Sequence, residues 1–138
     1  MTKKENIKNG LVEEFYDNGQ LKYRGNYKYG KQDGLWETFY LSNNNPFVLH
    51  GPIETRSNWK NDKRDGLGEW FYENGQLEER GMYKNGKLEG LWDEYYDNGQ
   101  LKWKINFQNG EYDGLWETFD EEGNLTKSTE WKDGELIE

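Results

Sequence analysis

The sequence contains no cysteine, no alanine, two prolines and one histidine, His50, in 138 residues. Without cysteine the chain can form no disulfide and carries no thiol nucleophile. A single histidine excludes a metal site built from several imidazoles. Alanine is the strongest helix former, so its absence argues against a helical protein.

The chain also lacks a long apolar segment. No run approaches the ~20 residues of a transmembrane helix. The N-terminus, MTKKENIKNG, is charged and has no apolar stretch typical of a secretory signal. We therefore expect a soluble, cytoplasmic protein. Its net charge of −9 disfavours nucleic acid and membrane insertion, and favours a basic protein as the partner.

Hydrophobic residues are scarce, at 32% of the chain against 33% charged residues, which approaches the composition of disordered proteins. Aromatic residues, however, make up 17% of the chain, with seven Trp, ten Tyr and six Phe. Disordered segments contain few aromatic residues. We therefore expect a folded protein with an aromatic core.

The most informative feature is an internal repeat. Similar units begin at Gly10, Gly34, Gly66, Gly90 and Gly114, spaced by 24 residues except for the second unit, which carries eight more. A fixed period of this length is typical of a repeat array. We assign residues 1–138 to one repeat domain, interrupted by an insertion within residues 41–58.

Each unit contains two short, aromatic-rich segments separated by Asn-Gly, a strong β-hairpin signal. We expect two-residue type I′ turns at Asn18-Gly19, Asn74-Gly75 and Asn98-Gly99, and longer turns between units. The sequence thus predicts an all-β fold, a single-layer twisted antiparallel meander of about ten strands in five tandem hairpins.

The unit GLWxxFYxNGQLKxxGxYKNGKxxG resembles the MORN repeat in its bacterial variant form. Chains made only of such variant repeats resemble bacterial antitoxins of the YwqK type, which neutralise a co-produced toxin. The resemblance implies an inhibitory protein–protein interaction and no catalysis. This chain departs from the pattern at Asn61-Asp62, which replaces Asn-Gly, and at the insertion.

The hairpin register predicts two different faces. One carries Trp36, Trp92 and Trp116, with a tyrosine four residues after each Trp position: Tyr16, Tyr40, Tyr72 and Tyr96. These rings either form the core, or part of them is exposed as a binding groove or a homodimer interface.

The opposite face repeats a carboxylate in every unit: Glu13, Glu37, Glu69, Asp93 and Glu117. The register pairs Glu13 with Arg24, Glu69 with Arg80 and Asp93 with Lys104, whereas Glu117 faces Ser128. The ladder is either a row of such cross-strand pairs or a surface for a basic ligand.

Charge is distributed unevenly along the chain. Residues 1–88 hold 14 basic and 13 acidic residues, and residues 89–138 hold 4 basic and 14 acidic residues. This excess is either a solvated face or a docking surface for a basic partner. The predicted partner-binding residues are Glu89, Asp93, Glu94, Asp97, Glu111, Asp113, Glu117, Asp120, Glu121 and Glu122, with the aromatic residues Trp92, Tyr96 and Trp116.

The insertion supplies a second candidate contact, Phe47, Val48, Leu49 and His50, because departures from a repeat commonly form loops on a binding face. An extended hairpin packed on its own sheet is the alternative. No nucleophile elbow, P-loop or metalloprotease motif is present, so we expect neither an enzyme nor a bound metal or cofactor.

The leading hypothesis is an antitoxin or immunity protein that binds a cognate toxin through the acidic C-terminal surface and the aromatic strip. A carbohydrate-binding or cell-wall-binding module is the alternative, because repeated Trp and Tyr can stack on sugars or enclose a choline-like amine. A third possibility is a MORN scaffold directed to a host protein or to a membrane surface.

Overall fold

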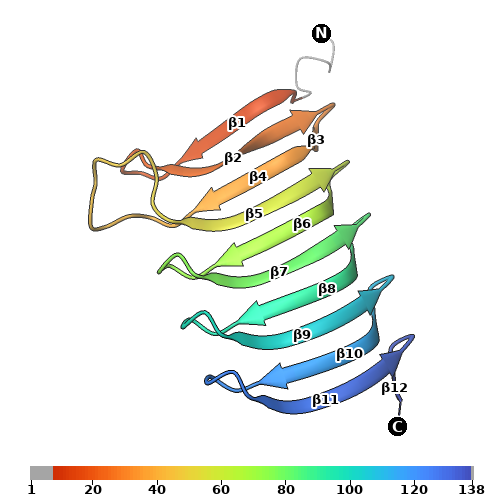
Figure 1. Cartoon of the computed structure of the whole chain (residues 1–138). Coiled ribbons are helices and arrows are strands. Elements are labelled where there is room, and N and C mark those ends of the chain that lie inside the picture. Colours follow the sequence, from red (N-terminus) through yellow and green to blue (C-terminus); the bar gives the residue numbers. More distant parts are fainter. Residues whose placement is uncertain (1–7, 138) are drawn as a thin grey trace.

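The computed structural model describes residues 8–137, which form one open antiparallel sheet (Figure 1). The strands follow one another in the order of the sequence, except that the short β3 pairs only with β2. The predicted single-layer meander is confirmed. The strands are β1 (Gly10–Phe15), β2 (Leu21–Lys28), β3 (Lys31–Gln32), β4 (Gly34–Phe39), β5 (Ile53–Lys60), β6 (Lys63–Phe71), β7 (Leu77–Lys84), β8 (Lys87–Tyr95), β9 (Leu101–Gln108), β10 (Glu111–Phe119), β11 (Leu125–Lys132) and β12 (Glu135–Ile137).

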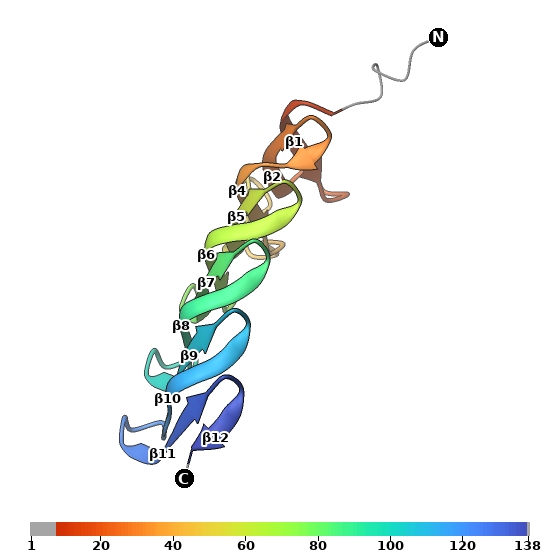
Figure 2. The ribbon, with the colours of Figure 1, turned by 90° about the vertical axis from the view of Figure 1, so that its right-hand side faces the viewer.

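The sheet is a narrow column one layer deep when it is viewed toward the turns that join the units (Figure 2). The first strand of a unit bends at a glycine with positive φ, such as Gly90 at +94° and Gly114 at +107°. Ladder pairing shifts at these bends, between Gly81 and Tyr83 and between Tyr112 and Trp116. A bulge of this kind increases the local twist and lets a strand curve.

The turn inside each unit differs from the prediction. In the first unit the amide of Gly19 donates to the Tyr16 carbonyl, and only Gly19, not Asn18, has positive φ. This is a type I turn followed by a glycine bulge, whereas a type I′ turn requires positive φ at both central residues. A two-residue turn at Asn18-Gly19 would pair Phe15 with Lys22, but Phe15 pairs with Leu21. The predicted pair Glu13–Arg24 is kept.

The turns between units are the tight ones. In the turn Asn85-Gly86 both residues have positive φ, 51° and 84°, and the flanking residues Lys84 and Lys87 pair directly. Both central residues of a type I′ turn have this conformation. Asn61 and Asp62, which replace Asn-Gly in one of these turns, also have positive φ, 52° and 66°, so this turn keeps the same conformation. The two-residue type I′ turns therefore lie between the units, where longer turns were predicted, and not within the units.

A ladder of tyrosine hydroxyls joins successive units. Each hydroxyl donates to a backbone carbonyl in the following unit: Tyr16 to Phe39 (2.6 Å), Tyr40 to Phe71 (2.6 Å), Tyr72 to Tyr95 (2.6 Å) and Tyr96 to Phe119 (2.8 Å). Burial raises the pKa of the Tyr16, Tyr40 and Tyr72 phenols, which remain donors at neutral pH. The fifth position is Asp120, so the ladder ends at Tyr96.

Ion pairs join units on the opposite face. The predicted Cα pairing of Glu13 with Arg24, Glu69 with Arg80 and Asp93 with Lys104 is confirmed. The side chains, however, pair with the neighbouring unit, and the bridges are Arg24–Glu37 (2.9 Å), Arg56–Glu69 (3.2 Å) and Arg80–Asp93 (3.2 Å). The predicted partners were therefore wrong, because each arginine lies between two carboxylates and binds the one on the following strand.

The tyrosine ladder yields a stability prediction. Tyr72→Phe removes the hydroxyl that binds the Tyr95 carbonyl and leaves that carbonyl without its donor, so we expect the free energy of unfolding to fall by about 1 kcal/mol. Urea denaturation followed by Trp fluorescence measures the change. Tyr29→Phe is the matched control, because Tyr29 is 77% exposed. Equal stability of the two variants would show that the ladder does not couple the units.

Candidate protein-binding surface

The aromatic face is the side of the sheet that carries Trp36, Trp92 and Trp116. Ladder pairing aligns one row of residues across this face: Trp36, Ser57, Gly68, Gly81, Trp92, Ile105, Trp116 and Thr129. Large and small residues alternate in parts of the row, because each indole leans over the preceding strand. A side chain at Gly25 would overlap the ring of Trp36, and one at Gly81 would overlap Trp92.

Neighbouring rings pack on these indoles. Trp36 lies 5.1 Å from Tyr27 and Trp92 lies 5.6 Å from Trp70, between ring centroids. Trp116 contacts Trp103, Tyr112 and Trp131 at centroid distances of 6.3, 4.9 and 6.0 Å. Trp36 is buried, but Trp92 and Trp116 are only half-buried. The aromatic face thus packs against itself and also remains open to solvent.

Two glutamates face each other in the middle of the aromatic face. A second row pairs Trp70 with Glu79, Glu79 with Glu94, and Glu94 with Trp103. In the described part of the chain neither carboxylate forms an ion pair. Burial, then the charges of Glu94 and Glu78, raise the pKa of Glu79. Burial also raises the pKa of Glu94, against a lowering by Lys102. Like charges directly opposite each other destabilise a sheet.

Glu79 was not among the predicted site residues. The predicted register covered only the hairpin within each unit, and Glu79 meets Glu94 across the boundary between two units. Counting back from the tight turn at Asn85-Gly86 places Glu79 opposite Trp92. The bend at Gly90 adds two residues to β8, so Glu79 lies opposite Glu94 instead. A register shift of two residues keeps Glu79 on the aromatic face but changes its cross-strand partner.

The predicted C-terminal acidic residues do not form one patch. Asp93 and Glu117 lie on the ion-pair face, where Asp93 is 8% exposed beside Arg80. Glu89 and Asp113 accept amide hydrogens of the turns at Asn109 and Asp133, so both carboxylates stabilise the backbone. Glu111 is exposed beside one of these turns. The structure therefore divides these residues between both faces and both edges of the sheet.

The remaining predicted acids lie at the hairpin edge, formed by the turns within the units. The Asp120 carboxylate accepts the amides of Glu122 (3.0 Å) and Asn124 (2.9 Å), and these hydrogen bonds lower its pKa. Asp97, Glu121 and Glu122 are exposed. Tyr96, also predicted here, is engaged in the tyrosine ladder. Of this group, Asp97, Glu121 and Glu122 present carboxylates to solvent.

Lysines occupy the opposite edge. The tight turns between units are flanked by directly opposed lysines: Lys28 and Lys31, Lys60 and Lys63, Lys84 and Lys87. At the next turn these positions are Gln108 and Glu111. The sheet therefore has a basic edge along its first three inter-unit turns and exposed carboxylates at the hairpin edge.

The insertion forms an irregular loop that packs on the first hairpin (Figure 1). The amide of Leu21 donates to the Leu49 carbonyl, and the Gln20 side chain binds the backbone of Ser42. The His50 ring stacks on Phe39 at 4.1 Å. The segment from Ile53 onward belongs to β5, so the insertion ends earlier than residue 58.

The four insertion residues proposed as contacts have different surroundings. Phe47 and Leu49 are 94% and 66% exposed, Val48 is half-buried, and His50 is held against Phe39. The loop packs on its sheet, as the alternative stated, but without the strands of an extended hairpin. Only Phe47 and Leu49 present large apolar surface to solvent.

Two general properties bear on the site. Among residues 8–137, no group of three His, Cys, Asp or Glu side chains is placed to hold a metal ion. Over the same residues, no helix has the length and apolar character needed to cross a membrane.

Comparison with known families matches the MORN repeat variant to residues 8–29, 64–85, 88–109 and 112–133, well over half of the chain. The second unit lies outside the matched segments, where the insertion interrupts the repeat, but its hairpin keeps the register of the others, with Trp36 opposite Ser57. A search of curated proteins found no match. The chain belongs to the MORN repeat variant family.

Proposed function

We propose that this MORN repeat protein is a non-catalytic inhibitor, of the antitoxin or immunity class, that binds a basic protein through its aromatic face. The opposed carboxylates of Glu79 and Glu94, set between Trp70 and Trp103, carry the proposal. Folding gains nothing from two like charges opposite each other on a partly buried surface. A cationic side chain from a partner would neutralise them and stack on the adjacent rings.

The protein contains an internal example of such a contact. In the third unit, Gly68 replaces the tryptophan of the row, and the guanidinium of Arg64 lies over Trp59 (4.9 Å), Trp70 (5.2 Å) and Tyr83 (5.8 Å). The aromatic face therefore accommodates an arginine stacked on several rings. Glu79 and Glu94 lie one unit further along the same face and offer carboxylates beside the rings.

The charged edges would orient the partner. Exposed Asp97, Glu121 and Glu122 attract a basic surface to the hairpin edge, while the lysine pairs repel it from the opposite edge. Long-range attraction raises the association rate, and contacts in the centre of an interface mainly set the dissociation rate. The resemblance to bacterial antitoxins supports a toxin as this basic partner.

The proposal is tested by affinity capture from a lysate of the source cells, with wild type, Glu79→Gln/Glu94→Gln and Glu121→Gln/Glu122→Gln used in parallel. We expect one basic protein to be retained by the wild type and by the second variant, and lost from the first. Expressed alone, that protein should arrest growth, and co-expression of the chain should restore it. Equal capture by both variants, or no growth arrest, contradicts the proposal.

Association kinetics separate the two acidic groups. With the purified partner, Glu121→Gln/Glu122→Gln should lower the association rate and its dependence on salt, because it removes charge from the edge. Glu79→Gln/Glu94→Gln should instead raise the dissociation rate by about tenfold or more, since charged pairs in a desolvated contact are worth over 1.4 kcal/mol. The reverse assignment would place the centre of the interface at the hairpin edge.

The same glutamates should lower stability. Because burial raises both pKa values above 4.5 in the folded state, the ionised pair destabilises the fold at neutral pH. Glu79→Gln/Glu94→Gln should therefore raise the free energy of unfolding by about 0.5 kcal/mol at pH 7, with solvent screening taken into account. The gain should shrink as pH falls through the raised pKa values and should disappear below pH 4.5, where the wild-type carboxyls become neutral in both states. Urea denaturation at pH 7 and pH 4.5 measures it, and a pH-independent gain contradicts the electrostatic origin.

A further inference from the structure

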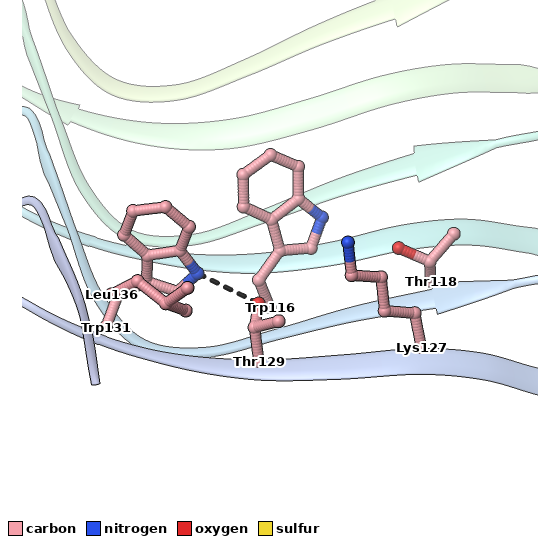
Figure 3. A pocket seen from close by; sticks show the side chains of 6 residues that line it. All are labelled: Trp116, Thr118, Lys127, Thr129, Trp131 and Leu136. Atoms are coloured by element: carbon pink, nitrogen blue, oxygen red, sulfur yellow. Dashed lines mark hydrogen bonds between the residues drawn. The ribbon is translucent and has the colours of Figure 1, made fainter. Parts of the chain in front are cut away.

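A pocket of about 160 Å³ opens on the aromatic face at the C-terminal end of the sheet (Figure 3). Its residues come from β10, β11 and β12: Trp116, Thr118, Lys127, Thr129, Trp131 and Leu136. The two indoles rise from the same side of the sheet, with Leu136 near Trp131 and with Lys127 and Thr118 at the other end of the view. The ring centroids of Trp116 and Trp131 are 6.0 Å apart.

In most earlier units the equivalent place, above the second strand of the unit, is filled by an indole from the first strand of the following unit. Above Gly25 of the first unit, Trp36 lies against Tyr23 and Tyr27. Above Gly81 of the third unit, Trp92 lies against Tyr83.

The second unit departs from this arrangement. The next strand has Gly68 in the row, the rings of Trp70 and Tyr83 lie over that glycine, and Arg64 stacks on Trp59, Trp70 and Tyr83. The fourth unit follows the arrangement, because Trp116 of the fifth unit lies against Trp103 and Tyr112. In three of the four earlier units the occupant is thus an indole.

In the fifth unit the same place lies above Thr129, the row residue of β11. Lys127, Trp131 and Leu136 surround it, and with Thr129 they line the pocket. Among the described residues no strand pairs with the outer edge of β11 between Leu125 and Thr129, since β12 pairs only from Glu130 onward. The pocket is thus shaped for a planar group that the described chain does not itself supply.

Two contacts that join earlier units are missing from the fifth unit. Asp120 replaces the tyrosine whose hydroxyl would bind a following unit, and its carboxylate caps its own turn. Ser128 replaces the arginine that would pair with a following carboxylate. A second copy of the chain would also bring Val12, not a tryptophan, to the pocket, because Val12 occupies the row position in β1.

The polar residues select the charge of that ligand. The Lys127 side chain lines the pocket, and within residues 8–137 it forms no ion pair. The Thr129 hydroxyl accepts the indole hydrogen of Trp131 at 2.9 Å, which leaves its own hydrogen to be donated. We propose that this pocket binds a small planar aromatic carboxylate, with the ring packed against the two indoles and the carboxylate on Lys127. Its volume suits one or two fused rings, below the ~300 Å³ of typical drug-sized sites.

The test is a titration of the full chain with 2-naphthoate, followed through the indole Nε1–H signals in ¹H–¹⁵N NMR spectra. Trp116→Phe and Trp131→Phe assign the two pocket signals. We expect saturable shifts confined to Trp116 and Trp131. The neutral analogue 2-naphthylmethanol, which lacks the carboxylate, should bind at least about tenfold more weakly, as expected for loss of a charge-assisted hydrogen bond.

Lys127→Gln should weaken naphthoate binding by a similar factor without unfolding the chain, because Lys127 is exposed. Lys104→Gln removes the same charge from the opposite face of the sheet and is the matched control. Equal affinities in the two variants, equal binding of the neutral analogue, or shifts spread over all seven tryptophans would each overturn the proposal.

Discussion

The hydrogen bond from a tyrosine hydroxyl to a carbonyl of the following unit is the contact on which the sheet depends. A single-layer sheet has no second layer to cover it, so no unit can bury its apolar face alone. The tyrosines reach from one hairpin turn to the end of the next unit's first strand, as Tyr40 does to Phe71 and Tyr72 to Tyr95. The arginine–carboxylate pairs make the same connection on the other face. Stability therefore arises between neighbouring units, and each of these contacts needs both neighbours in place.

The departures from the repeat are more informative about function than the repeat itself. A regular unit places a tryptophan over a small residue, and Trp36 over Gly25 shows how tightly the indole fits. Where the pattern changes, the face acquires chemistry that packing does not require. Arg64 stacks on Trp70 in the part of the face where the row residue is Gly68, Glu79 and Glu94 bring two carboxylates together, and Thr129 with Lys127 lines an open pocket. Because these changes lie along one face, binding properties can vary from unit to unit while the backbone stays constant.

The fold was predictable because the period, the Asn-Gly pairs and the alternation of aromatic and charged residues all indicate hairpins. The turn types were not, since Asn-Gly suits both a type I′ turn and a type I turn with a glycine bulge, and Asn18-Gly19 and Asn85-Gly86 adopt different ones. The ion-pair partners and the Glu79–Glu94 contact depend on pairing between units. That pairing passes through the bend at Gly90, whose two additional residues no local pattern reveals. The positions of the acidic residues in the repeat likewise do not reveal that Glu89 and Asp113 accept hydrogen bonds from the backbone amides of the turns.

The couplings between units weaken toward the C-terminal end. Lys104 stands opposite Glu117 where earlier units have arginine opposite a carboxylate, and the two form no ion pair within residues 8–137. The last hairpin has no tyrosine at position 120, and β11 is paired along its full length only with β10.

A terminal unit held from one side opens at a lower free energy than a central one. A ligand that bridges Trp116 on β10 and Trp131 on β11 would bind only the closed form and would thereby stabilise this hairpin. Binding of the proposed ligand would therefore be coupled to the order of the last unit, because the tyrosines of the hydrogen-bond ladder and the arginines of the ion pairs lie in the units that precede it.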